Sequence, residues 1–156
     1  MKNYIMNQIA DSAATKQAIL ENEPLINLLV EVAGKCVDVY RKHKKILIAG
    51  NGGSAADAQH FAAELVGRYG FDRPSLPSIS TSGNSQNVLN AFESAKERGI
   101  TTVALVGRDG GKMANVADYA IIVPSNATPR IQESHLLIEH MICDIIEKEI
   151  FGGGVA

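Results

Sequence analysis

Residues 46–54 are ILIAGNGGS, an apolar run that breaks abruptly into glycines. The run Ile46-Leu47-Ile48-Ala49 is typical of a buried strand, and the segment after Ser54, AADAQHFAAEL, has the composition of a helix. Glycines at a strand-to-helix turn let backbone N–H groups approach a ligand, and a helix N-terminus attracts anions. A second polar stretch at 80–85, STSGNS, supplies hydroxyl groups suited to a phosphate. Together the two stretches predict a site for a phosphorylated metabolite.

The bulk composition excludes several classes of protein. The chain has 156 residues, enough for one domain with a real core, and its 15 basic against 17 acidic residues give a formal net charge of −2. We therefore expect no nucleic-acid partner, since no basic run provides an electrostatic footprint for phosphates. No apolar run reaches the length of a membrane span, and the N-terminus does not open a signal peptide. Cys36 and Cys143 have no motif spacing and indicate buried thiols, so we expect a cytoplasmic protein.

The periodicity of apolar residues predicts alternating helices and strands. We expect helices over residues 4–20, 24–41, 54–69, 86–98, 112–117 and 129–151, and strands over 45–49, 76–80, 101–106 and 119–123. Such alternation favours parallel strands joined by right-handed crossovers. The predicted fold is α/β, a flavodoxin-like three-layer sandwich with a central parallel sheet, preceded by N-terminal helices. Residues 1–156 form one domain, with helices over 1–43 and the α/β core over 44–151. Ligands of such folds bind at the carboxyl ends of the strands, where both polar stretches begin.

Four motifs in order resemble a known family. The segments GNGGS (50–54), DAQHFAAEL (57–65), STSGNS (80–85) and TPRIQESHLLIEH (128–140) are together similar to the phosphoheptose isomerases of the sugar-isomerase (SIS) domain group. The resemblance covers nearly the whole chain. It implies an aldose–ketose isomerase that converts sedoheptulose 7-phosphate into D-glycero-D-manno-heptose 7-phosphate, the first step of ADP-heptose synthesis for bacterial surface lipopolysaccharide.

The chain departs from this family at one place. In the family a further loop, helix and strand precede the serine-rich stretch, whereas here Ile79 directly abuts Ser80. A βα unit of roughly 30 residues is therefore predicted to be absent at the 79/80 junction. Pro77 in this short run makes a poor central strand, which independently indicates a junction. Either the printed sequence omits a segment or this protein has lost one strand, and we favour the omission.

The resemblance assigns the catalytic pair to Glu64 and His140. Isomerisation moves a proton between C1 and C2 through an enediol, which needs a base for the carbon-bound proton and a group that handles the oxygen-bound protons. Glu64 would be the base and His140 its acid–base partner. His60 precedes Glu64 by four positions, so both lie on one helical face. Taken alone, Glu64 is more often a solvated helix residue, and the family pattern reverses that preference.

The family also implies a zinc ion on His60, Glu64, Gln132 and His140. The i,i+4 spacing of His60 and Glu64 allows both to contact one divalent metal. Gln132 and His140, however, are separated by a rise of roughly 12 Å if they share one helix. We therefore expect the site at a subunit contact, with a neighbouring chain or a distorted helix start supplying one ligand. The family implies a homotetramer, which the apolar N-terminal helices fit.

The remaining predicted site residues bind the substrate. Ser80, Thr81, Ser82 and Ser85 would hold the phosphate, helped by the helix that Ser85 opens, although simple N-capping by Asn84 or Ser85 is the alternative role. The sugar hydroxyls would meet residues of the glycine-rich turn and the final helix, namely Asn51, Gly52, Gly53 and Gln132. Arg73 and Arg130 are more often solvated at such positions. His135 is expected to be structural or to line the pocket.

A non-catalytic function is the main rival. A related SIS protein associates with the bacterial replication initiator and keeps the fold and the serine loop, but it lacks the glutamate and histidine at the positions of Glu64 and His140. Both residues are present here, which favours the enzyme. A sugar-phosphate sensor within a regulator would bring a DNA-binding domain, and this chain has no room for one.

Overall fold

A computed structural model of the chain describes residues 1–76, 78–82 and 85–152; for residues 78–82 and 85 the description covers the backbone. The helices are α1 (Lys2–Leu20), α2 (Glu23–Arg41), α3 (Gly53–Val66), α4 (Ser85–Glu97), α5 (Gly111–Val116) and α6 (Thr128–Glu147), and a π-helical turn, Lys148–Gly152, follows α6. The strands are β1 (Ile46–Gly50), β2 (Ser78–Ser82), β3 (Val103–Gly107) and β4 (Tyr119–Val123). This order of elements is the one that the periodicity predicts.

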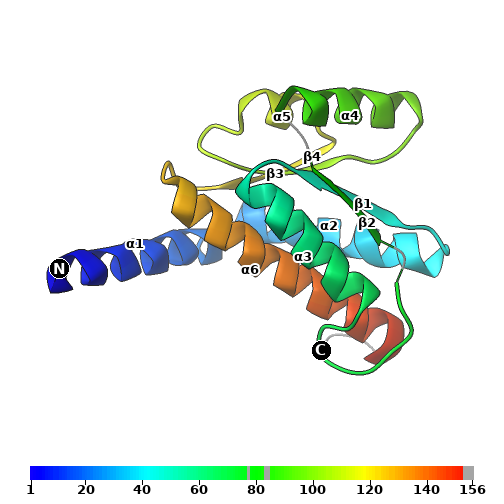
Figure 1. The fold of residues 1–156 in the computed structure, drawn as a ribbon, viewed down its shortest axis with the longest axis horizontal. Coiled ribbons are helices and arrows are strands. Elements are labelled where there is room, and N and C mark those ends of the chain that lie inside the picture. The colour runs from blue at the N-terminus through cyan, green and yellow to red at the C-terminus, as the bar shows by residue number, and fades with distance from the viewer. Residues whose placement is uncertain (77, 83–84, 153–156) are drawn as a thin grey trace.

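Local sequence signals explain where the long helices begin. The Asn22 side chain accepts a hydrogen bond of 3.1 Å from the backbone N–H of Leu25 and thereby caps α2, which has Pro24 in its first turn. Pro129 occupies the same position in α6. The three-layer arrangement is confirmed: α4 and α5 lie on one side of the strands, whereas α2, α3 and α6 lie on the other (Figure 1). Among the described helices, none is long and apolar enough to cross a bilayer.

The strands form two parallel pairs in the described residues, not one continuous central sheet. β1 pairs with β2 in a register that sets Gly50 beside Ser82, and β3 pairs with β4 in a register that sets Gly107 beside Val123. One detail of the prediction is wrong: the predicted strand covers 76–80, whereas β2 begins at Ser78 and includes Thr81 and Ser82, which were expected in the polar stretch after it. The parallel register nevertheless brings the ends of β1 and β2 to one edge, as the two polar stretches require.

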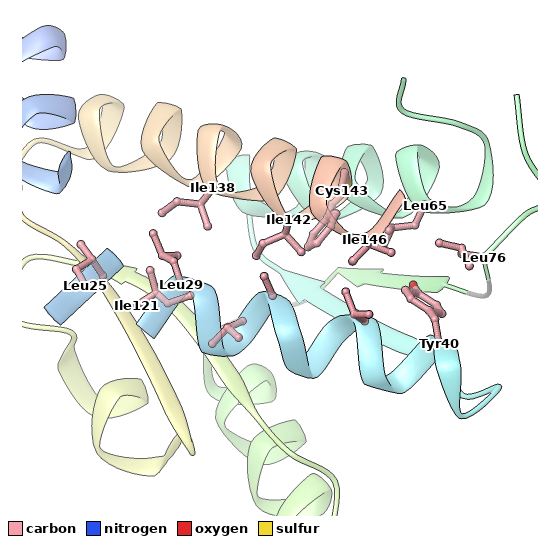
Figure 2. Packing of buried hydrophobic residues seen from close by; sticks show 14 of the residues in the cluster. Leu25, Leu29, Tyr40, Leu65, Leu76, Ile121, Ile138, Ile142, Cys143 and Ile146 are labelled. Carbon is pink, nitrogen blue, oxygen red and sulfur yellow. The ribbon is translucent and has the colours of Figure 1, made fainter. Parts of the chain in front are cut away.

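The main core lies between the strands and the layer formed by α2, α3 and α6. Ile138, Ile142 and Ile146 recur along one face of α6 and are at most 4% exposed. They face α2, and Ile146 lies close to Leu65 of α3, as Figure 2 shows. Cys143 is buried in the same cluster, whereas Cys36 is half-buried, so the prediction of two buried thiols holds fully only for Cys143.

The first strand is covered on one face only. Ile46 and Ile48 pack against the core cluster, but Leu47 is 59% exposed and Ala49 is also exposed. The prediction of a fully buried strand is therefore wrong for β1. Side chains alternate across a strand, so these residues point to opposite faces. The exposed face of β1 lies on the side of the strands that carries α4 and α5 (Figure 1).

Candidate active site

The glycine-rich turn connects β1 to α3 and exposes backbone donors. Gly52 has φ +53°, a conformation that glycine adopts without strain, and it stands at the N-cap of α3. Among the described side chains none caps this helix, and the N–H of Ala55 donates to the carbonyl oxygen of Gly52, which leaves the N–H groups of Gly53 and Ser54 for a ligand. The Oδ1 atom of Asn51 is buried and has no hydrogen-bond partner among the described residues. An acceptor of this kind suits a sugar hydroxyl.

Three of the predicted site residues converge between α3 and α6. The Nε2 atoms of His60 and His140 lie 2.9 Å apart, and His60 Nε2 lies 3.6 Å from Glu64 Oε1. His60 and Glu64 come from successive turns of α3, while His140 comes from α6. The His60 and Glu64 side chains are 43% and 24% exposed, so a ligand can reach them. The trio forms a carboxylate–imidazole cluster open to solvent.

Tyr69 adjoins this cluster, and sequence reasoning missed it. Its ring centroid lies 5.6 Å from that of His140, at an interplanar angle of 38°. The His60 and His140 rings meet edge to face at 5.1 Å. The sequence predicts a helix as far as residue 69, whereas α3 ends at Val66, so Tyr69 lies in the following turn, and none of the four motifs includes it. Its aromatic side chain forms a wall beside His140.

Gln132 does not join the trio in this subunit. Its Nε2 donates a hydrogen bond of 3.2 Å to Asp57 Oδ1, and its amide lies against Gly53, where a Cβ atom would come within 2.6 Å of it. Gln132 therefore reaches the first turns of α3, whereas His140 contacts the middle of that helix. The sequence predicts that Gln132 and His140 of one subunit can hardly reach the same ion. This placement of Gln132 agrees with that expectation.

Asp57 is a second residue that the motifs did not single out. It is 6% exposed, and its Oδ2 has no hydrogen-bond partner within the described part of the chain. Asp57, His60 and Glu64 are spaced i, i+3 and i+7, so they form a polar stripe on one face of α3. That polar stripe is the sequence signal that could have identified Asp57 as part of the site. Because Asp57 accepts from the Gln132 N–H, it turns the carbonyl oxygen of the Gln132 amide toward other partners.

Two further titratable groups of α6 are buried behind the site. His135 Nε2 lies 3.3 Å from the carbonyl oxygen of Val106 at the end of β3, and burial lowers the pKa of its imidazole. Burial, and secondarily the nearby Asp57 carboxylate, raises the pKa of Glu139 to about 7. The contact with Val106 supports the structural one of the two roles expected for His135.

Several residues considered in the sequence analysis are not part of the cluster of His60, Glu64 and His140. The side chains of Ser80, Thr81, Ser82 and Ser85 lie outside the described residues, as does all of Asn84. Arg73 is not solvated as expected, because its side chain is only 2% exposed and pairs with Glu147. Arg130 is half-buried on α6, where its Nη1 donates to the carbonyl oxygen of Gln8 in α1. Within the residues that the structure describes, no three His, Cys, Asp or Glu side chains meet the geometry of a metal site.

Comparison with known proteins identifies close relatives. Residues 9–80 match the SIS domain family model. A phosphoheptose isomerase of Sulfurimonas denitrificans is 57% identical over 194 residues, covering 99% of this chain and 100% of the relative. That of Aneurinibacillus thermoaerophilus is 45% identical, covering 97% and 96%. The 194 aligned positions exceed the 156 residues of this chain, so part of the Sulfurimonas protein lies opposite a gap.

Solved structures agree with the sequence relatives. A phosphoheptose isomerase from Francisella tularensis superposes with a TM-score of 0.85 at 28% identity, covering 94% of this chain and 97% of that one. One from Neisseria gonorrhoeae superposes with a TM-score of 0.80 at 33% identity, covering 94% and 98%. The fold and the motif residues therefore point to the same group of proteins.

Proposed function

The chain belongs to the phosphoheptose isomerase family, and we propose that it converts sedoheptulose 7-phosphate into D-glycero-D-manno-heptose 7-phosphate. The observation that carries this proposal is the convergence of Glu64, His60 and His140 between α3 and α6, with His60 and Glu64 in the second half of α3. The helix that carries the base for a carbon-bound proton also presents backbone donors at its N-terminus, which suit an anionic, hydroxylated ligand.

The chemistry moves one proton from C1 to C2 and one proton from O1 to O2 of the bound sugar. Glu64 removes a proton from C1 of the ketose while the C2 carbonyl oxygen gains a proton, which forms an enediol. Return of the carbon-bound proton to C2 and loss of the O1 proton then give the aldose. Because His140 contacts His60, and His60 lies beside Glu64, an imidazole pair is available for the oxygen-bound protons on the same side of the site. General acid–base groups of this kind contribute typically about 10²–10⁴-fold in rate.

We propose that the substrate binds at the edge of the strands, between the glycine-rich turn and the serine-rich stretch. The Oδ1 of Asn51, which has no hydrogen-bond partner in the described part of the chain, supports a contact to a sugar hydroxyl. The turn leaves room for the ligand to approach the backbone at Gly52, and the backbone of Gly53 lies beside Gln132, so a ligand there would meet both residues. For the phosphate, we propose Ser80, Thr81, Ser82 and Ser85. The register that sets Ser82 beside Gly50 supports a common edge for both groups. Gln132 would contact the sugar from the first turns of α6.

We also propose a zinc ion on this site. His60, Glu64 and His140 carry the nitrogen and oxygen donors that zinc accepts, and the spacing of 2.9 Å between the two imidazole nitrogens is near the ~3.3 Å expected around a tetrahedral ion. Within the described residues of one subunit the three side chains do not meet the geometry of a metal site by themselves. A neighbouring subunit's Gln132 would complete the set. When bound, the ion would polarise the carbonyl and hydroxyl oxygens of the sugar. Chelation should remove activity, and added zinc should restore it; metal analysis should give one ion per wild-type subunit and less in His60→Ala.

The assembly and the missing segment complete the proposal. We propose a homotetramer in the cytoplasm, a location that the two free cysteines support. We further propose that a βα unit present in the family is absent at the junction of Ile79 and Ser80. The uncovered face of β1 and the excess of aligned positions over residues of this chain support that absence.

Replacing Glu64 by Gln tests the function directly. We expect Glu64→Gln to fold, to keep phosphate binding, and to lose about 10²–10⁴-fold in kcat with sedoheptulose 7-phosphate, because the amide cannot accept the carbon-bound proton. Product formation is followed as appearance of the aldose. The matched control is Glu93→Gln, the same change at an exposed position of α4. A Glu64→Gln enzyme with nearly wild-type turnover would exclude Glu64 as the base.

A non-catalytic partner of the replication initiator is the weaker alternative. Such a protein needs neither a carboxylate nor imidazoles at this site. In this chain, however, His60 lies 2.9 Å from His140 and 3.6 Å from Glu64. The relatives named above are isomerases. The catalytic function is therefore the one that the site supports.

A further inference from the structure

A buried carboxylate at the end of α6 holds the turn that follows α3. Glu147 is 1% exposed, and its Oε2 accepts hydrogen bonds from the backbone N–H groups of Tyr69 at 3.0 Å and Gly70 at 2.9 Å. Its Oε1 accepts from the N–H of Phe71 at 3.2 Å. Three successive amides thus converge on one carboxylate, an arrangement that fixes the path of the backbone.

Arg73 connects the same carboxylate to the end of α3. Its side chain is 2% exposed, and its Nε lies 3.3 Å from Glu147 Oε1. Its Nη1 donates to the carbonyl oxygen of Leu65 at 3.0 Å, and its Nη2 donates to that of Glu64 at 2.9 Å. These carbonyls belong to the last turn of α3, where intrahelical partners are lacking. The guanidinium therefore caps the helix while it neutralises Glu147.

We propose that Arg73 and Glu147 are positioning residues for the active site. The pair fixes the position of the last turn of α3, which carries Glu64, relative to His140. It also fixes the backbone of Tyr69, whose ring lies 5.6 Å from the His140 ring. Both His140 and Glu147 belong to α6, so the anchor ties the base on α3 to the helix that carries its partner. This inference rests on the proposed roles of Glu64 and His140.

The geometry of the guanidinium makes the proposal specific to arginine. A lysine at position 73 keeps the positive charge, so Glu147 retains a partner, but a single ammonium cannot reach the two helix carbonyls and the carboxylate in the planar arrangement that a guanidinium offers. Arg73→Lys should thus loosen the end of α3 without leaving a buried charge uncompensated. A small misplacement of a catalytic group is enough to cost a large factor in rate.

The experiment compares Arg73→Lys with a matched control. Arg41→Lys makes the same change in an exposed ion pair that joins the end of α2 to Glu149, beyond α6. We expect Arg73→Lys to lower kcat about tenfold or more while KM for sedoheptulose 7-phosphate changes by less than about threefold. Arg41→Lys should leave both unchanged. A folded Arg73→Lys enzyme with wild-type kcat would overturn the proposal.

Two further variants separate positioning from general stability. Val32→Ala removes buried atoms of α2 that are 1% exposed, and it provides an enzyme destabilised without contact to the anchor. If it lowers kcat at 25 °C as much as Arg73→Lys does, the proposal is wrong. If Arg73→Lys does not fold, Tyr69→Ala tests the same proposal, because it removes the ring that the anchor holds beside His140 and changes only a partly exposed side chain. A fall in kcat supports the anchor, and an unchanged kcat overturns it.

The parallel Glu64→Gln measurement distinguishes this inference from the proposed function. Loss of turnover in Glu64→Gln together with wild-type kcat in Arg73→Lys would overturn only the positioning role. Retained turnover in Glu64→Gln would overturn the proposed base, whatever the anchor variants show. Loss of turnover in both, with Arg41→Lys unchanged, supports both.

Discussion

Gly50 and Gly53 lie three positions apart around the same turn, yet a methyl group at each would meet a different kind of atom. At Gly50 a Cβ would lie 2.2 Å from the backbone oxygen of Ser54, which cannot move without displacing α3. At Gly53 it would lie 2.6 Å from the Gln132 amide, the far end of a flexible side chain. We expect Gly50→Ala to lower the free energy of unfolding by about 1–3 kcal/mol, as overpacking does.

Gly53→Ala should instead affect the reaction. The Gln132 side chain can swing away at little cost in stability, but it then leaves Asp57 and the first turns of α3. We expect a fall in kcat/KM with nearly unchanged urea unfolding. Each variant thus serves as the control of the other. A Gly53→Ala enzyme with full activity would contradict a substrate contact by Gln132.

Individual residues differ in how far the sequence could predict them. His60 and Glu64 were predictable neighbours because i,i+4 spacing places them on one helical face, and the family pattern added His140. Arg73 was not predictable, since an arginine in a loop is usually solvated and its partner Glu147 is far along the chain. Tyr69 reaches His140 through that same long-range contact. Local patterns do not specify such pairings.

At the scale of elements, β1 alternates between buried and exposed side chains. Leu47 is 59% exposed, whereas Ile48 packs against the core cluster. Leu47→Thr should therefore change the free energy of unfolding by less than about 0.5 kcal/mol, as surface substitutions do. Ile48→Thr should cost about 1–3 kcal/mol, because it places a hydroxyl against apolar neighbours. Urea unfolding of both variants measures the difference.

The same pair of variants tests the missing βα unit. If the matching segment of a family member is inserted between Ile79 and Ser80, the added helix should cover the exposed face of β1. Leu47→Thr should then become as costly as Ile48→Thr. An unchanged small cost in the extended protein would contradict the proposal that this face lacks its cover.

Element boundaries were largely predictable, while strand pairing was not. Pro24 and Pro129 mark helix starts, and the apolar periods give the lengths of α2 and α6. Whether four strands form one sheet depends on contacts between segments distant in sequence. The sequence around Pro77 indicates a junction, but it does not predict which strand pairs with β1. Two parallel pairs, β1–β2 and β3–β4, are the structural outcome.

At the scale of the whole molecule, α1 extends away from the body of the protein (Figure 1). The first ten residues are all exposed, and they include the apolar side chains of Ile5 and Ile9, the latter 65% exposed. These two lie on one helical face four positions apart. The base of α1 is held to α6 by the Lys16–Glu133 ion pair of 3.3 Å. An apolar face presented in this way suits burial against a second copy of the chain.

The double variant Ile5→Lys/Ile9→Lys tests this role of α1. Two cations on the apolar face should be too costly to bury, so we expect the mass in solution to fall from four times the 16.7 kDa of the chain to a smaller multiple. Light scattering after size exclusion measures it. The matched control, Asn3→Lys/Asn7→Lys, adds the same charge on the opposite face. If a neighbour supplies Gln132, dissociation should also lower activity and make it depend on protein concentration. Unchanged mass in the Ile5→Lys/Ile9→Lys variant would exclude this face from the subunit contact.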